Sequence, residues 1–473
     1  MANVDLILLI LVLAAGLYMA WNIGANDVAN AIGTSVGSGA LKLSTAVLIA
    51  AVFEFSGAFF FGSHVTDMVQ EGIVNPEVFT NDPRIFVFGM LSALIAAGVW
   101  LQFASYFGWP VSTTHSIVGS IVGFGAIVGG VSSVYWDNVI YITFGWILSP
   151  LIGGFISYFI FTILRRRIFY APCPVVAAKN LTPKIVFVFA STLGTALTFN
   201  GLKNLDLDLT FTESLFGGMG FGLLASIVSY FFINQIQTPP GELKKEPDYS
   251  PEAILSLNKV RKHLKKVRKE TKGETAYRVS QLLDRVEELS HETSKHERVG
   301  SVDYASVEKI FARLQVMSAC SMAFAHGAND VANAIGPLSA AVSVILSGTV
   351  ASTSTPIPTW TLALGGIGII LGLVTWGWRV IETIGKKITE LTPSRGFSAE
   401  FGAALTIVFA SRLGLPISTT HTLVGSVLGV GLARGIEALN LNTTRDIVIS
   451  WIITVPAGAL ISIVCFYILD GIF

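Results

Sequence analysis

Two copies of one polar motif lie in apolar parts of the chain, where carboxylates and carboxamides are unusual. The first, GANDVANA, spans residues 24–31, and the second spans residues 327–334. Each copy offers one carboxylate and two carboxamides, whose oxygen atoms suit a small hard cation such as Na⁺. An ionisable group inside a membrane segment is a functional candidate by default. The candidate residues are Asn26, Asp27, Asn30, Asn329, Asp330 and Asn333.

Helix capping is the competing interpretation of this motif. A helix that ends at Gly24 would let Asn26 or Asp27 cap a second helical piece and satisfy amide groups that lipid cannot. Capping accounts for one polar residue per copy, whereas each copy has three. Asn26 and Asn30 stand four residues apart, so they share one face of a helix that begins there. We therefore expect a helix break at each motif, with the polar groups available as ligands.

A second duplicated motif, PVSTTH at 110–115 and PISTTH at 416–421, predicts two helix N-termini. Exposed amide donors, the positive end of the helix dipole and several hydroxyls would form a cradle for a tetrahedral oxyanion. Ordinary helix capping by Ser and Thr is the alternative. His115 and His421 could donate to the anion, carry a proton or fix the hairpin by hydrogen bonds. The candidate hydroxyls belong to Ser112, Thr113, Thr114, Ser418, Thr419 and Thr420.

Two isolated acids, Glu54 and Glu400, lie inside apolar segments, where a charge is costly. They are not repeat partners, because the alignment of the two halves places Ile369 opposite Glu54 and Leu94 opposite Glu400. Each acid could ligate a cation or carry a proton. The alternative is a structural role in hydrogen bonding between helices.

The elements that must position these groups are membrane helices. The chain has 473 residues, of which 52% are hydrophobic and only 13% are charged, about half the usual charged share of a soluble domain. The apolar segments predict an all-α polytopic membrane protein with about twelve transmembrane segments. The formal net charge of +0 argues against a nucleic-acid partner. The three cysteines are far apart and show neither a disulfide framework nor a metal-ligand spacing.

A change of composition divides the chain into three parts. Residues 1–236 form a first membrane half, and residues 310–473 form a second. Residues 237–309 are hydrophilic, carry charges of both signs and keep apolar residues at helical spacing, which predicts a helical hairpin. A solvated linker is the alternative. Basic residues in the connections place the 237–309 loop in the cytoplasm and both termini outside.

The duplicated motifs relate the two halves to each other. The offset is 303 residues from Asn26 to Asn329 and 306 residues from Ser112 to Ser418, so both motifs recur in the same order at nearly the same distance. Seven predicted crossings precede the charged loop, and an odd number makes the two copies enter the membrane from opposite sides. An inverted-topology repeat with broken helices or re-entrant hairpins at the midplane is typical of secondary transporters.

The duplicated GANDVANA and P(V/I)STTH motifs resemble the inorganic phosphate transporter (PiT) family over nearly all of the membrane-embedded chain. The resemblance implies phosphate uptake coupled to a cation, alternating access around a midplane site, and a homodimer in the plasma membrane. The central loop is short compared with animal members of the family. By resemblance, phosphate would be bound by Ser112, Thr113, Thr114, Ser418, Thr419, Thr420, Asn26 and Asn329, and sodium by Asp27, Asn30, Asp330, Asn333, Glu54 and Glu400.

Sodium is the favoured coupling ion, because the candidate ligands are all oxygen atoms. A proton-coupled or metal–phosphate symporter, or a transporter of another oxyanion such as sulfate, would use nearly the same parts. We expect no enzyme, because the acids, hydroxyls and imidazoles occur in symmetric pairs without a lone nucleophile. No cofactor is expected beyond the transported sodium ions, and the remaining partners are phosphate and the lipid bilayer.

Overall fold

The computed structural model describes most of the chain as α-helix. Within the described residues there is no named strand, and the isolated bridges Val74–Val134 and Phe199–Leu209 are the β-type pairings. Seven ranges are described: 2–199, 209–235, 251–350, 357–377, 380–381, 389–436 and 439–473.

The helices follow one another with short connections. Among the described residues, eight helices are long and apolar enough to cross a membrane, and the chain is an all-α polytopic membrane protein. The helices of the N-terminal part are α1 (Ala2–Gly37), α2 (Leu43–Phe61), α3 (Ser63–Glu71), α4 (Pro83–Tyr106), α5 (Thr113–Phe124), α6 (Trp136–Leu164), α7 (Pro174–Thr198) and α8 (Phe211–Asn234). They are followed by α9 (Pro251–Glu270), α10 (Glu274–Asp330), α11 (Ala332–Ser347), α12 (Thr359–Thr375), α14 (Pro393–Arg412), α15 (Thr419–Arg434) and α16 (Leu441–Ile472).

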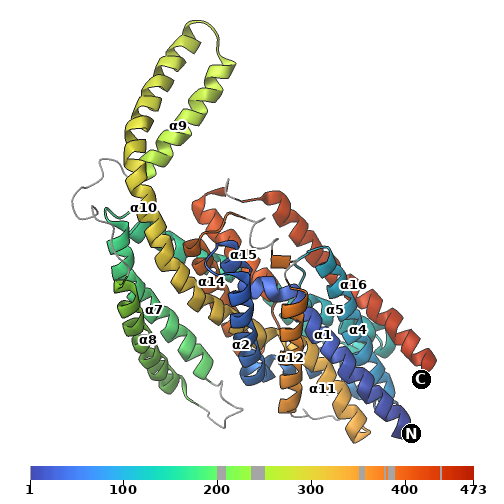
Figure 1. Cartoon of the computed structure of the whole chain (residues 1–473). Coiled ribbons are helices and arrows are strands. Elements are labelled where there is room, and N and C mark those ends of the chain that lie inside the picture. The colour runs from blue at the N-terminus through green and yellow to red at the C-terminus, as the bar shows by residue number, and fades with distance from the viewer. Residues whose placement is uncertain are drawn as a thin grey trace. The chain divides into compact units, whose positions relative to one another are not determined.

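The larger of two compact units holds both polar motifs. It comprises residues 1–161, 189–222 and 312–473. Helix α1 packs against α4, α11 and α12, while α16 packs against α4 and α5 (Figure 1). Helices from the two ends of the sequence are therefore neighbours in this unit.

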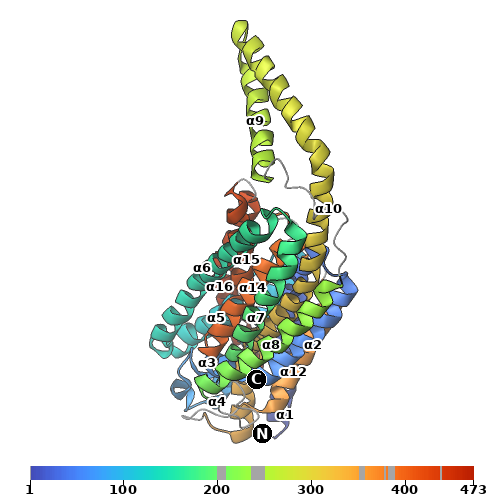
Figure 2. The same cartoon turned by 90° about the vertical axis from the view of Figure 1, so that its left-hand side faces the viewer.

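The smaller unit comprises residues 162–188 and 223–311 and contains a helical hairpin. Helix α9 runs beside the N-terminal part of α10 (Figure 2), and the Lys265 ammonium lies 3.0 Å from the Glu287 carboxylate across the pair. A hydrogen bond from Lys265 to the Glu287 carboxylate, together with the positive charge of Lys265, lowers the pKa of the Glu287 carboxyl. Helix α10 continues through residue 309 without a break. The division into two membrane halves and a cytoplasmic loop stays a prediction.

The predicted break at the first GANDVANA copy is wrong. Helix α1 is continuous through Gly24, Asn26 and Asp27 and ends at Gly37. At the second copy, α10 ends at Asp330 and α11 begins two residues later. A continuous helix satisfies its own backbone amides, so the asparagines and the aspartate of the first copy are not needed as caps.

The motif glycine of α1 serves close packing instead. A Cβ atom on Gly24 would lie 1.9 Å from the carbonyl oxygen of Ile369, and one on Gly372 would lie 1.8 Å from that of Trp21. The backbones of α1 and α12 therefore touch, as small residues allow in membrane helix pairs.

Replacing Gly372 with alanine should therefore force α1 and α12 apart. We expect Gly372→Ala to lower the free energy of unfolding by about 1–3 kcal/mol or more, the usual cost of overpacking. Thermal unfolding of the detergent-purified protein measures this loss. Gly217→Ala is the matched control, because a Cβ atom on helical Gly217 meets no heavy atom within 4 Å. Equal melting temperatures for the two variants would contradict the close approach.

Candidate functional site

Three carboxylates surround one histidine in the interior of the larger unit. His326 Nε2 lies 3.2 Å from Asp330 Oδ2 and 3.7 Å from Asp27 Oδ2, while His326 Nδ1 lies 3.1 Å from Glu54 Oε1. All four side chains are buried. Asp27, His326 and Asp330 also offer ligand atoms close enough together to hold a metal ion. The structure thus brings together two motif aspartates and one of the two isolated glutamates.

His326 was missed as a candidate from the sequence, although it directly precedes the second motif copy. The first copy has Ile23 at the equivalent position, so the repeat gives no duplicated signal. Its partner Glu54 comes from α2, which approaches α10 closely, because a Cβ atom on Gly327 would lie 2.1 Å from the Glu54 carbonyl oxygen. The signal that could have identified His326 is its position as a titratable residue within an apolar segment.

The PVSTTH and PISTTH motifs begin helices α5 and α15, as predicted. Ser112 and Ser418 are the N-caps, each accepting a hydrogen bond from the amide of the histidine three residues on, at 3.2 and 3.1 Å. Thr113 of α5 donates to Asp330 Oδ2 at 3.3 Å, and Thr419 of α15 donates to the same oxygen at 2.7 Å. Two helix N-termini from opposite halves of the chain therefore meet at one carboxylate.

The second asparagine of each GANDVANA copy contacts the hairpin of the other half. Asn30 Nδ2 donates to Thr420 Oγ1 at 2.8 Å, and Asn333 Nδ2 donates to Thr114 Oγ1 at 3.1 Å. Thr420 Oγ1 also lies 3.1 Å from Asp27 Oδ1. The same pairing thus occurs twice and connects the two halves of the chain.

The first asparagine of each copy contacts a serine that sequence reasoning missed. Asn26 Nδ2 donates to Ser105 Oγ and Asn329 Nδ2 donates to Ser411 Oγ, both at 2.9 Å. Each asparagine also donates to a backbone carbonyl, that of Trp109 or Leu415, at 3.2 Å. The sequence did contain a signal for these serines, because both stand at the same repeated spacing, seven residues before the serine of the STTH motif.

Glu400 lies in a separate cluster of hydrogen-bond donors. Its Oε1 accepts from Thr34 and Ser35 of α1, both at 2.5 Å, and from Gln315 of α10 at 3.2 Å, while its Oε2 accepts from Ser318. Among the described residues, no hydrogen bond or ion pair joins Glu400 to the carboxylates around His326. The two isolated glutamates therefore occupy different environments.

The rings of the two motif histidines pack edge to face against each other, between two tryptophans. The ring centroids of His115 and His421 are 4.3 Å apart, that of His115 is 3.9 Å from Trp146, and that of His421 is 3.6 Å from Trp451. Both histidines are buried. The two imidazole rings therefore hold the two hairpins against each other by packing. The sequence-based interpretation had assigned the histidines to hydrogen bonding and had not included this packing role.

Several buried oxygen atoms at the site have no hydrogen-bond donor among the described residues. Buried acceptors are normally satisfied, so each such oxygen needs another partner. Carboxylate and carboxamide oxygens are the usual ligands of hard cations. The oxygens without a donor include Oδ1 of Asn26, Asn329, Asn333 and Asp330, and Oδ2 of Asp27.

Comparison with known proteins gives consistent matches. A family described as the phosphate transporter family matches residues 23–462. The chain is 44% identical to "Inorganic phosphate transporter 2-1, chloroplastic" from Arabidopsis thaliana, covering 97% of this chain and 71% of that protein. It is similar to a solved structure titled "The sodium-dependent phosphate transporter", with a TM-score of 0.79 and 37% identity over 98% of this chain and 100% of that one.

Proposed function

Because the chain belongs to the phosphate transporter family, we propose that it takes up inorganic phosphate by symport with sodium ions. The observation that carries this proposal is the meeting of the α5 and α15 N-termini at the Asp330 carboxylate. Helix N-termini attract anions, whereas a carboxylate attracts cations. A site with both features favours an anion and a cation bound side by side. The similar solved structure is that of a sodium-dependent phosphate transporter, which supports the choice of ion.

The phosphate ion would bind between the two STTH hairpins. Thr113 and Thr419 now direct their hydroxyls at Asp330, and a phosphate ion between the hairpins would accept from them in its place. The amides and the dipoles of α5 and α15 would offset part of its negative charge. Ser112, Thr114, Ser418 and Thr420 complete the proposed cradle, with Asn26 and Asn329 at its sides.

Sodium ions would bind the carboxylates and the carboxamide oxygens that lack a donor. Asp27, Asp330 and Glu54 converge on His326. The asparagine oxygens that lack a donor belong to α1 (Asn26), α10 (Asn329) and α11 (Asn333). Anion and cation would each leave uncompensated charge in a low dielectric if bound alone. This interdependence would couple the two fluxes. Glu400 is proposed as a separate cation ligand, with the oxygen atoms of Thr34, Ser35 and Ser318 around it.

Alternating access would proceed by rocking of the two halves around this site. The duplicated contacts Asn30–Thr420 and Asn333–Thr114 support an inverted repeat, because each half supplies the same pair of groups. We further propose a homodimer in the plasma membrane, with the 237–309 loop in the cytoplasm and both termini outside.

Proton or metal–phosphate coupling is the second candidate, favoured by His326. An imidazole between three carboxylates can carry a proton, and together with Asp27 and Asp330 it can ligate a transition metal. Under sodium coupling, His326 would instead keep the carboxylates in position.

We expect His326→Gln to lower the maximal rate of sodium-driven phosphate uptake about tenfold, because a lost partner at a buried charged group costs about 1–3 kcal/mol. Initial rates of labelled phosphate uptake into proteoliposomes measure the effect. His263→Gln is the control, because His263 is exposed on α9. Wild-type rates in His326→Gln would contradict a role for His326 in the site.

Competition between oxyanions tests the substrate. Arsenate shares the tetrahedral shape and the ionisable proton of phosphate near neutral pH, whereas sulfate carries no such proton. We expect excess arsenate to abolish uptake of labelled phosphate into proteoliposomes and an equal excess of sulfate to leave it unchanged. Inhibition by sulfate as strong as that by arsenate would show a general oxyanion transporter.

A further inference from the structure

The His326 imidazole lies close to three carboxylates without forming a hydrogen bond to any of them. Its Nε2 lies 3.2 Å from Asp330 Oδ2 and 3.7 Å from Asp27 Oδ2, and its Nδ1 lies 3.1 Å from Glu54 Oε1. Neither ring nitrogen has a hydrogen-bond partner among the described residues. A hydrogen bond needs the oxygen nearly in line with the N–H group. The carboxylate oxygens therefore stand beside the axis of each ring nitrogen and not on it.

Ligands of a single metal ion stand in this relation to one another. The metal lies on the axis of the nitrogen, and the other ligand atoms lie beside that axis. Two ligands of a tetrahedral ion are about 3.4 Å apart when each is about 2.1 Å from the metal. The distances of 3.2 and 3.7 Å from Nε2 to the two aspartates lie on either side of this value. Asp27, His326 and Asp330 offer ligand atoms that all lie within 4.8 Å of one another.

Neighbouring side chains hold these ligand atoms in place. Thr420 donates to Asp27 Oδ1 at 3.1 Å, so Oδ2, the oxygen that contacts His326, is left without a donor among the described residues. Glu54 faces the other ring nitrogen, where its charge favours a proton on Nδ1 and leaves the electron pair of Nε2 free. A carboxylate in this position is typical of histidines that bind metals.

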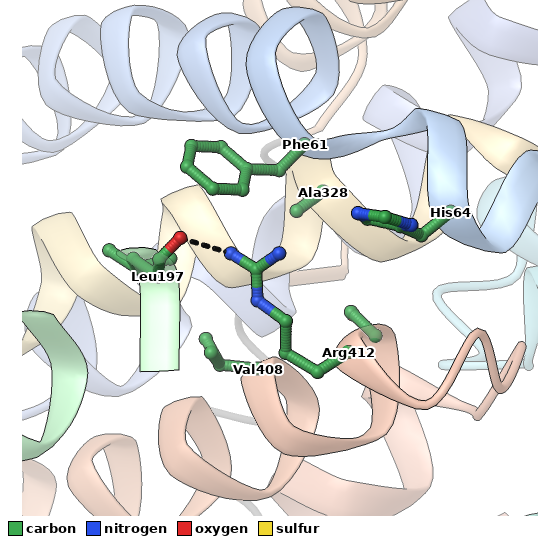
Figure 3. A pocket seen from close by; sticks show the side chains of 7 residues that line it. Phe61, His64, Leu197, Ala328, Val408 and Arg412 are labelled. Atoms are coloured by element: carbon green, nitrogen blue, oxygen red, sulfur yellow. Dashed lines mark hydrogen bonds between the residues drawn. The ribbon is translucent and has the colours of Figure 1, made fainter. Parts of the chain in front are cut away.

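The cluster lies on the face of α10 that is turned away from Arg412. Figure 3 shows Ala328 of α10 in the same small pocket as the Arg412 guanidinium and the Phe61 ring. Ala328 stands about 200° round the helix from both His326 and Asp330, because each residue turns the helix by about 100°. The Arg412 guanidinium therefore does not take the place of a cation at Asp330.

The imidazole determines the class of ion that fits the cluster. Nitrogen ligands of this kind suit Zn²⁺ and neighbouring transition metals, whereas hard cations prefer oxygen. The three ligands come from both copies of the GANDVANA region, since Asp27 lies on α1 and the other two lie one turn apart on α10. An ion bound to all three would join the two copies and oppose any movement between them.

We propose that Asp27, His326 and Asp330 form an inhibitory site for a divalent transition metal such as Zn²⁺, with Glu54 orienting the imidazole. The metal excludes sodium from the two aspartates and holds both GANDVANA copies together. It therefore blocks transport and is not itself carried. Binding of the metal follows from the geometry of the cluster, whereas the inhibition rests on the proposed function.

Cobalt absorption tests binding without transport. Co²⁺ can replace Zn²⁺ in sites of this kind, and it absorbs visible light strongly when it has four ligands. We expect detergent-purified protein in phosphate-free buffer to show these bands with one Co²⁺ per chain, and Zn²⁺ to remove them. His326→Gln and Asp27→Asn should abolish the bands, and Glu54→Gln should weaken binding about 10–100-fold. His263→Gln, at an exposed position of α9, is the control and should bind as wild type does.

Sodium-driven phosphate uptake into proteoliposomes tests the inhibition. Zn²⁺ at about ten times its dissociation constant should lower the initial rate roughly tenfold at low sodium, by mass action. Saturating sodium should restore most of the rate, because both ions use Asp27 and Asp330. The same concentration of Mg²⁺ should have no effect, since Mg²⁺ prefers oxygen ligands. The rate of His326→Gln, whatever its value without metal, should not change when Zn²⁺ is added.

Four results would decide against parts of this account. Wild-type cobalt bands in His326→Gln would overturn the proposed site. If that variant does not fold, a wild-type affinity in Glu54→Gln would overturn it, because Glu54 is not among the three ligands. Stimulation of uptake by Zn²⁺ would overturn the inhibitory role and favour metal–phosphate coupling. Failure of wild-type uptake without added metal would instead refute the proposed function and leave the cobalt result standing.

Discussion

Asp330→Asn is expected to reduce sodium-driven phosphate uptake roughly 100-fold or more. Asp330 Oδ2 accepts from Thr113 and Thr419 and lies 3.2 Å from His326 Nε2, so its charge is at the centre of the site. Loss of one partner of a buried charged group costs about 3–5 kcal/mol, which corresponds to this reduction. The asparagine keeps the shape of the side chain and an oxygen that accepts from the threonines. The protein should therefore fold, and it should bind sodium more weakly.

The measurement is initial phosphate uptake by purified, reconstituted protein, together with its melting temperature. Asp27→Asn should behave in the same way, because Asp27 Oδ2 lies 3.7 Å from the same nitrogen, His326 Nε2, that Asp330 contacts. Asp137→Asn is the matched control, since Asp137 is exposed at the start of α6. Sodium-dependent uptake at the wild-type rate in the Asp27→Asn, Asp330→Asn double variant would contradict a role for both carboxylates in binding sodium.

The double variant Thr114→Val, Thr420→Val is expected to raise the KM for phosphate roughly 100-fold, since each buried group left without its partner costs about 1–3 kcal/mol. Thr114 Oγ1 accepts from Asn333 and donates to the Ile417 carbonyl at 2.9 Å. Thr420 Oγ1 accepts from Asn30 at 2.8 Å. Valine retains the branched shape but removes both hydroxyls, so the carboxamides lose their partners and the cradle loses two donors.

Serine at the same positions is the control, because it keeps each hydroxyl. Thr114→Ser, Thr420→Ser should show a KM within about threefold of wild type, since the hydrogen bonds of the hydroxyls are retained. KM is measured by labelled phosphate uptake at saturating sodium. If the serine and valine variants had the same KM, the hydroxyls would have no part in phosphate binding, and only the shape of the side chain would matter.

The duplicated residues were the part of the site that the sequence could predict. Asn30 and Asn333 repeat the same contact with Thr420 and Thr114, and the STTH motifs begin helices as expected. Repetition identified these residues because each half of the chain supplies the same asparagine and the same threonine to the repeated contact. Which half each asparagine contacts could not be predicted, since the partners lie hundreds of residues apart.

The residues without a repeat partner were harder to predict. Glu54 pairs with His326, whereas their counterparts by the repeat are Ile369 and Ile23. The alignment correctly placed Ile369 opposite Glu54, because Gly24 packs on the Ile369 carbonyl as Gly327 packs on that of Glu54. The polar pair Glu54–His326 thus stands where the repeat has the apolar pair Ile369 and Ile23. A search for residues that occur in both halves cannot find the polar pair.

The expected helix break at the first GANDVANA copy failed for a physical reason. Glycine and asparagine favour helix ends in water, but a membrane helix keeps its backbone hydrogen bonds unless a neighbour replaces them. Gly24 is required by the contact with α12, and Asn26 by Ser105 and the Trp109 carbonyl. Composition alone does not distinguish a glycine that ends a helix from one that lets two helices touch.

Uptake of labelled phosphate into proteoliposomes under an imposed sodium gradient, set against an imposed proton gradient, tests the central claim most directly. We predict uptake with the sodium gradient alone, and none with the proton gradient alone in sodium-free buffer. Uptake driven by protons alone would contradict sodium symport. It would assign the cluster of Asp27, Glu54, Asp330 and His326 to proton carriage.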